Sequence, residues 1–173
     1  MNKSTVILAC LVLGVAALSA DARERPKRSG GGAAVHTQDG GVAAGGAHTA
    51  TGANGTRTAG GGVVSDGAGN AVGGSAGSTT TANGSVRHAG AFQHSADGTT
   101  TRRGASSGSG KRGSFTSQGT ATGDGHGNGT LNRATQANGA NGGSYDGSTS
   151  ASKSGVQHNG SCTNPAGETV ACK

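Results

Sequence analysis

The sequence has very few side chains that could build a hydrophobic core. Among its 173 residues there is no tryptophan, and aromatic residues make up 2% of the chain. Beyond residue 22 the large apolar side chains are eight valines, two phenylalanines, one leucine and one tyrosine. Burying so few of them stabilises a fold much less than the entropy of ordering about 150 residues destabilises it. The composition therefore excludes an ordinary close-packed globular domain.

The same shortage argues against an enzyme. Nucleophilic catalysis needs a base held within hydrogen-bonding reach of the nucleophile in a rigid site, and such sites are lined mainly by apolar side chains. The six histidines are scattered along the chain. On one extended strand, His88 and His94 would lie roughly 20 Å apart, too far to share a metal ion. We expect no enzymatic activity, no cofactor and no metal site.

One stretch, TGDGHGNGT at 122–130, places Asp124, His126 and Asn128 at alternate positions with glycine between them. Numbered from Asp124 as an EF-hand loop, His126 stands where an oxygen ligand is required, and Thr135 replaces the bidentate glutamate. A phosphate-binding loop would need a lysine followed by serine or threonine, which this stretch lacks. We therefore expect a turn here rather than a metal or phosphate site.

No apolar run in the sequence is long enough to span a bilayer. The longest, Val6–Leu18, falls short of the roughly 18 residues required. It follows Lys3 and precedes small residues, which is typical of a secretory signal peptide over residues 1–22, cleaved after Ala20 or Ala22. We expect a secreted or cell-surface protein, periplasmic or extracellular, with no transmembrane segment after cleavage.

Cysteine is also scarce, and two of the three cysteines lie at the end of the chain. Removal of the signal peptide leaves Cys162 and Cys172. Secreted chains meet an oxidising compartment, so we expect these two to form a disulfide bond. Between them, residues 164–167 read NPAG, which suits a type I turn with proline second and glycine fourth. The sequence predicts a disulfide-closed hairpin over 162–173.

Glycine is the residue that the chain has in abundance. Eleven of the sixteen Asn and Asp residues are followed by one of the 37 glycines, against about 3.4 such pairs expected by chance. Asn-Gly and Asp-Gly favour the positive φ angles of type I′ hairpin turns. The candidate turn positions are Asp66, Gly67, Asn83, Gly84, Asp97, Gly98, Asp124, Gly125, Asn138 and Gly139.

The spacing of these turns indicates a repeat of roughly 14 residues. The motif DGxGN occurs at 66–70 and again at 124–128. In SVRHAGAFQH, Val86, His88 and Phe92 alternate with smaller or polar residues, as they would on one face of a strand. We predict an all-β fold of short strands joined by Asn/Asp-Gly turns, β-solenoid-like or a meander, with substantial disorder. The alternative is a largely disordered glycine-rich chain.

Four segments follow from these patterns. They are a signal peptide at 1–22, a basic and then glycine-rich flexible segment at 23–62, a repetitive low-complexity β region at 63–161, and the terminal hairpin at 162–173.

Charged residues are few, and basic ones outnumber acidic ones by 14 to 8. The formal net charge is +6, with a basic cluster directly after the signal peptide. We expect a non-enzymatic structural protein of the cell surface or extracellular matrix that self-associates. The alternative is a basic secreted effector or antimicrobial protein that acts on anionic surfaces. Without aromatic residues interleaved among the cations, no specific nucleic acid partner is expected.

Overall fold

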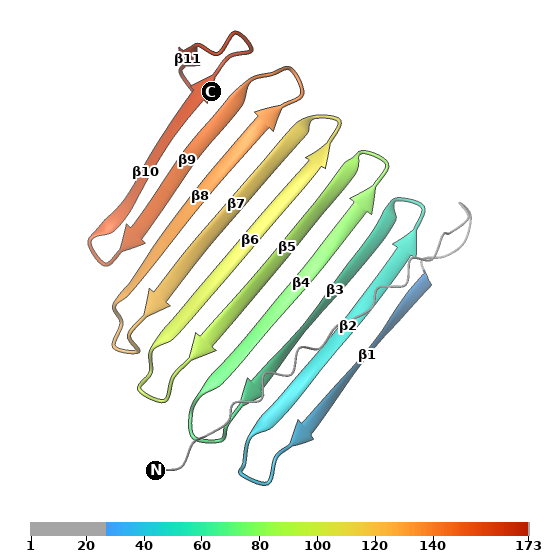
Figure 1. The fold of residues 1–173 in the computed structure, drawn as a ribbon, viewed down its shortest axis with the longest axis vertical. Coiled ribbons are helices and arrows are strands. Elements are labelled where there is room, and N and C mark those ends of the chain that lie inside the picture. Colours follow the sequence, from blue (N-terminus) through green and yellow to red (C-terminus); the bar gives the residue numbers. More distant parts are fainter. Residues whose placement is uncertain (1–26, 173) are drawn as a thin grey trace.

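Each described strand after the first pairs with the strand that precedes it in the sequence. The computed structural model describes residues 27–172, which form one antiparallel sheet of eleven strands in sequence order (Figure 1). This confirms the prediction of an all-β chain of repeated strands, with the topology of a meander. The strands are β1 (Lys27–His36), β2 (Val42–Gly52), β3 (Gly55–Ser65), β4 (Ala71–Thr81), β5 (Gly84–His94), β6 (Thr100–Gly110), β7 (Gly113–Gly123), β8 (Gly129–Gly139), β9 (Ser144–Ser152), β10 (Gly155–Thr163) and β11 (Thr169–Val170).

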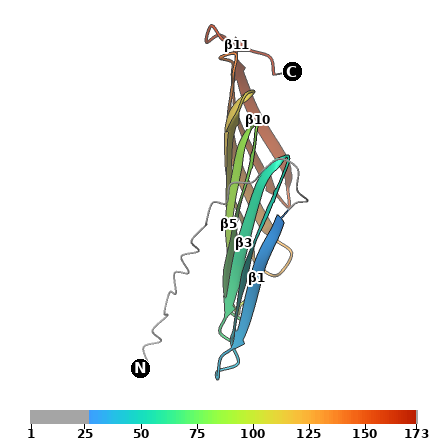
Figure 2. The ribbon, with the colours of Figure 1, turned by 90° about the vertical axis from the view of Figure 1, so that its right-hand side faces the viewer.

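The sheet is a single layer. Seen from the side, no second layer of the described chain covers either face (Figure 2). No apolar side chain between residues 27 and 172 is buried, and the one buried polar side chain is Ser117, at 6% exposure. The absence of a hydrophobic core in this sheet agrees with the scarcity of large apolar residues in the sequence. Its order depends on hydrogen bonds between strands, and each strand from β2 to β9 has a full-length neighbour on both sides.

Two kinds of connection join the strands. Five-residue loops connect β1 to β2, β3 to β4, β5 to β6 and β7 to β8, at what we call the loop end of the sheet. At the opposite end, the turn end, two-residue turns connect β2 to β3, β4 to β5 and β6 to β7. Because short and long connections alternate, the true repeat is a pair of strands, which begins at Gly55, at Gly84 and again at Gly113. The shorter repeat expected from the sequence is the average step from one strand to the next.

The alternation changes after β8. There the connection from β8 to β9, at the turn end, has four residues, 140–143, and makes the five-residue loop pattern only when Gly139, the last residue of β8, is counted as its first. A two-residue turn then joins β9 to β10 at the loop end, and a five-residue loop precedes β11. The two DGxGN motifs occupy the same loop in different repeats, because the first follows β3 and the second follows β7.

Each five-residue loop has glycine in its fourth position. The backbone N–H of the first loop residue donates to the carbonyl of the fifth, as from Ser95 to Thr99 at 2.9 Å. The N–H of Gly98 donates to the Ser95 carbonyl at 2.9 Å, and Gly98 has a φ of 89°. The loop at 95–99 is thus a type I turn closed by a left-handed glycine in a G1 bulge. The glycines with positive φ at the fourth position are Gly40, Gly69, Gly98, Gly127, Gly142 and Gly167.

The prediction of type I′ turns is wrong. Such turns require positive φ at both central residues, but every positive φ in residues 27–172 belongs to a glycine. In the turn between β4 and β5, Asn83 is a central residue and Gly84, with a φ of 146°, begins the next strand. Asn-Gly therefore serves here by placing glycine just after the turn.

The expected division at residue 63 has no counterpart in the sheet. Residues 27–62, expected to form a flexible segment, contain β1, β2 and most of β3, which pair in the same way as the later strands. The expected signal peptide at 1–22 lies outside the described residues. The described part of the chain has no helix that could cross a membrane.

Replacement of a left-handed loop glycine should destabilise the sheet. A Cβ on Gly127 would contact nothing within 4 Å, so Gly127→Ala tests its φ of 87° alone and should cost about 1–2 kcal/mol. Gly31→Ala is the matched control, because its Cβ also meets open space and its φ is not positive. Urea unfolding followed by far-ultraviolet circular dichroism should show a lower midpoint for Gly127→Ala only. Equal midpoints for both variants would contradict this assignment.

Candidate interaction surfaces

Alternation along the strands divides the side chains between two different faces. On the face we call the ring face lie the aromatic rings of Phe92, Phe115 and Tyr145, together with Leu131. The opposite face, the hydroxyl face, has small and polar side chains along its centre. One row of the hydroxyl face, from β1 to β10, is Ser29, Thr49, Thr58, Ser78, Arg87, Ser107, Thr116, Gln136, Asp146 and Ser161.

Rings on the ring face lie across glycines of the neighbouring strand. Phe92 is directly opposite Gly73, and a Cβ built on Gly73 would approach Phe92 Cε1 to 2.5 Å. Phe115 stands in the same relation to Gly108, at 2.6 Å. The glycine leaves room for the ring to cover the backbone of the next strand, which supplies apolar contact that a single layer otherwise lacks. His88 lies opposite Gly77 in the same way.

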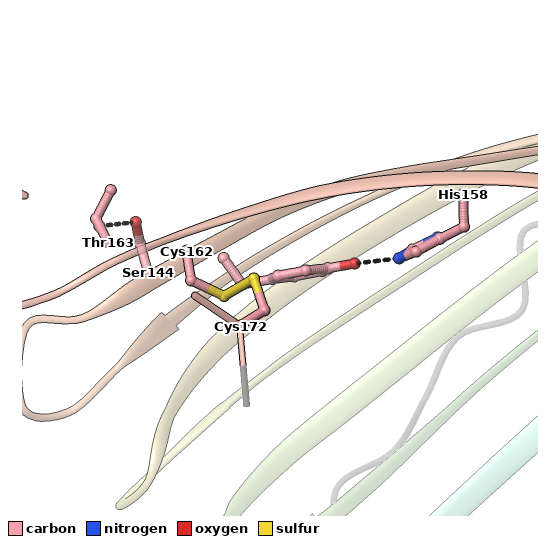
Figure 3. The surroundings of a disulfide bond; sticks show 6 residues. Ser144, His158, Cys162, Thr163 and Cys172 are labelled. Carbon is pink, nitrogen blue, oxygen red and sulfur yellow. Dashed lines mark hydrogen bonds between the residues drawn. A yellow bond between two sulfur atoms is a disulfide. The ribbon is translucent and has the colours of Figure 1, made fainter. Parts of the chain in front are cut away.

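A hydrogen-bonded group lies on the ring face near the chain terminus. The Tyr145 hydroxyl is 3.2 Å from His158 Nε2 (Figure 3). On the other side of the imidazole, Thr149 Oγ1 is 2.9 Å from His158 Nδ1. Both ring nitrogens of His158 therefore have hydroxyl partners, each able to donate or accept. Tyr145 also lies directly opposite Cys162. These contacts fix the imidazole across β9 and β10 as part of the sheet surface.

Cys162 and Cys172 form a disulfide bond, with their Cα atoms 5.3 Å apart (Figure 3). Cys162 belongs to β10, and Cys172 follows β11, which pairs with β10 over two residues only. Between them the N–H of Gly167 donates to the carbonyl of Asn164 at 2.9 Å, closing a turn over the residues predicted to make one. The bond ties the end of the chain to the last full strand.

Asp124 is the centre of a closed hydrogen-bonded loop. Its Oδ1 accepts the backbone N–H groups of His126 at 2.8 Å and Asn128 at 3.0 Å, and its Oδ2 accepts Asn128 Nδ2 at 2.6 Å. Both carboxylate oxygens thus have donors within the loop itself. These bonds, that from the Asn128 side chain foremost, lower the pKa of Asp124. The stretch forms a turn, and Asp66 makes the same three bonds in the loop at 66–70.

The other predicted turn positions fall in three settings. Asp97 and Gly98 lie in the loop at 95–99, where Asp97 Oδ1 accepts the N–H of Thr99 at 2.8 Å. Asn83 and Gly84 flank the turn before β5. Asn138 and Gly139 instead end strand β8, paired with Ser144 and Gly113, and Gly139 has no positive φ. The left-handed glycine of that loop is Gly142, three residues later, so this position was predicted too early.

Charge is distributed unequally between the faces. In the described strands the ring face has Arg28, Arg57, Arg102 and Arg133 and no Asp or Glu. The hydroxyl face combines Lys27, Arg87 and Arg103 with Asp146. The remaining aspartates of residues 27–172 lie in the loops of the loop end, and this part of the chain contains no group of three or more possible metal ligands. The arrangement gives the ring face a positive charge, which counting the charged residues along the sequence does not reveal.

The two edges of the sheet differ in how they are covered. The outer side of β1 has no partner strand among the described residues. The outer side of β10 pairs with β11 only at Cys162 and Thr163, which leaves residues 155–161 as a second open edge. Open edges present backbone N–H and C=O groups to any further strand.

Comparison with known proteins found no matching family model, no matching curated protein and no matching solved structure.

A methyl group beneath a ring should disturb the ring face. Gly73→Ala places a Cβ 2.5 Å from Phe92 Cε1 and 2.8 Å from the Gly62 carbonyl oxygen, and should lower stability by about 1–3 kcal/mol as the ring and the neighbouring backbone move away. Gly104→Ala, on the same face, brings its Cβ no closer than 3.7 Å to any atom and is the matched control. Urea midpoints should fall for the first variant and hold for the second. An unchanged midpoint for Gly73→Ala would refute the ring–glycine pairing.

The aspartate loops should lose their contribution to stability in acid. The folded pKa of Asp124 is lowered by its hydrogen bonds, so its carboxylate stabilises the fold above the usual aspartate pKa and ceases to do so as pH falls through the folded value. The difference in stability between the wild type and Asp124→Ala should therefore be largest near about pH 6 and shrink towards about pH 2. Thermal melts at matched pH values measure it. A pH-independent difference would contradict the carboxylate's role.

Proposed function

We propose that this protein is a secreted, non-enzymatic structural protein of the cell surface or extracellular matrix that associates with copies of itself. The observation that carries the proposal is that residues 27–172 form a single-layer sheet with two edges that no described strand covers and with no buried apolar side chain. A strand gains both its hydrogen bonds and its ring–glycine contacts from neighbours, so each open edge gains stability from a further strand. Association between chains supplies what burial within one chain does not.

The surfaces of the sheet favour a role without catalysis. The hydroxyl face has an open depression towards the turn end, lined mostly by serine, threonine, alanine and glycine. No titratable side chain in residues 27–172 is buried. An exposed surface of small hydroxyl groups suits contact with an extended partner more than the enclosed chemistry of an enzyme. The Cys162–Cys172 bond suits the oxidising conditions outside the cytosol.

Self-association should depend on concentration and survive salt. The mature oxidised chain should sediment as progressively larger species as its concentration rises, and electron microscopy should show ribbons one sheet thick. Backbone pairing is screened little by salt, so the distribution should change little between about 0.1 and 1 M sodium chloride. A chain that stays monomeric at every concentration would overturn the proposal.

A second candidate function is supported by the charge of the ring face. Arg102 of this face lies directly opposite Phe92, and the described strands place no carboxylate on this face. Such a surface attracts anionic lipid or cell-wall polymer. This is the basic effector or antimicrobial alternative.

The two faces provide a matched test of that alternative. The double variant Arg57→Ser/Arg102→Ser removes two exposed cations from the ring face, and Arg87→Ser/Arg103→Ser removes two from the hydroxyl face. Binding to vesicles containing phosphatidylglycerol should weaken much more in the first variant, and should fall steeply with salt in the wild type. Equal losses in the two variants would show that net charge matters and the ring face does not.

A further inference from the structure

The open edge of β10 is shorter than that of β1 and can pair with part of it. On β10, the seven residues Gly155–Ser161 lack an outer partner among the described residues, because β11 begins to pair at Cys162. On β1, the seven residues Ser29–Val35 have no outer partner strand among the described residues. Both segments are extended and project alternate side chains to the same two faces.

Strand direction allows these two edges to join. The sheet has ten full-length strands before the short β11, and neighbours run antiparallel throughout. Because ten is an even number, β1 and β10 run in opposite directions (Figure 1). A second copy placed beside β10 in the same orientation therefore presents its β1 antiparallel, and the meander continues from one chain to the next.

The rows of paired residues fix a register for that junction. Following opposite residues from strand to strand, the row that starts at Ser29 in β1 reaches Ser161 in β10, and the row from Gly31 reaches Asn159. In this register, the β10 residue that ends a row pairs with the β1 residue that begins the same row in the second copy. Ser161 then lies opposite Ser29, and Gly155 lies opposite Val35. This register keeps each face of the sheet continuous across the junction.

The disulfide-held β11 limits the junction to this length. Thr169 and Val170 lie opposite Thr163 and Cys162, the positions that Lys27 and Arg28 of a second copy would otherwise take. A longer overlap towards the turn end is blocked by β11, which the Cys162–Cys172 bond holds in place. The short last strand thus acts as a stop that defines where the incoming strand ends.

Side chains at the junction repeat contacts found inside the sheet. In this register His158 on β10 faces Gly32 of the second copy, the same pairing as His88 with Gly77. Val156 faces Ala34, and at 71% exposure Val156 is the most exposed large apolar side chain of the described residues. Joining the edges covers this valine.

We propose that the outer edge of β10, Gly155–Ser161, binds the outer edge of β1, Ser29–Val35, of a second copy, antiparallel and with Ser161 opposite Ser29. The inference rests on the proposed self-association and specifies its geometry. Because the contact is head to tail, the two remaining edges stay open, and addition continues into a ribbon rather than closing as a dimer.

Disulfide trapping between two variants that each gain one cysteine, in addition to Cys162 and Cys172, tests this register. Gly31→Cys in one copy and Asn159→Cys in another place the two Cα atoms directly opposite, at a separation that a disulfide spans. Val35→Cys with Asn159→Cys is the matched control, on the same face but displaced by four residues, about 13 Å along the strand. After mixing and mild oxidation, the first pair should give at least about tenfold more cross-linked dimer than the control. Peptide mass spectrometry should find Cys162–Cys172 intact.

The outcomes separate the inference from the proposed function. Ala33→Cys with Gln157→Cys, opposite in the same register, should cross-link as the first pair does and guards against a folding defect in one variant. Equal or greater cross-linking of the control pair overturns the register. If sedimentation shows association but neither matched pair cross-links, the edge geometry is wrong while self-association stands. If there is neither association nor cross-linking, both are wrong.

Discussion

Hydrogen bonding between neighbouring strands is the interaction on which the rest of this structure depends. No apolar side chain of the described residues is buried, so removing a strand would expose little apolar surface but would break a ladder of backbone bonds on each side. The register is carried without net shift from β1 to β10, as the row from Ser29 to Ser161 shows. Because the register does not shift, the side chains of one row lie in a continuous line across ten strands.

Small residues have specific uses in such a layer. Glycine admits rings across the neighbouring backbone, as Gly73 does for Phe92, and takes the left-handed position in each five-residue loop. Aspartate organises the loop end, and Asn70 Oδ1 reaches the N–H of Ala96 in the adjacent loop at 2.9 Å. Connections at the turn end are linked too, since the N–H of Lys111 donates to the Asn83 carbonyl at 3.1 Å. Hydrogen bonds therefore link neighbouring connections at both ends of the sheet, as they link neighbouring strands within it.

The sequence contained enough to predict strands, turns and a weak repeat, because Asx-Gly pairs and the alternation around Phe92 are local signals. It did not reveal that residues 27–62 form strands, since glycine and alanine have low β-propensity and are held here by their partners. The turn type was wrong because Asn-Gly can serve with only the glycine at positive φ, as at Gly84. Ring–glycine pairs such as Phe115 with Gly108 depend on cross-strand register, which spacing along one strand does not encode.

Amide hydrogen exchange in the dilute monomer tests the central claim most directly. If interstrand hydrogen bonds alone hold the sheet, consecutive amides through β5, β6 and β7 should all be protected, because each of these strands is paired on both sides. In β1, paired on one side only, protected and rapidly exchanging amides should alternate between residues 29 and 35. Rapid exchange throughout β5–β7, or alternating protection there, would contradict a continuous single-layer sheet.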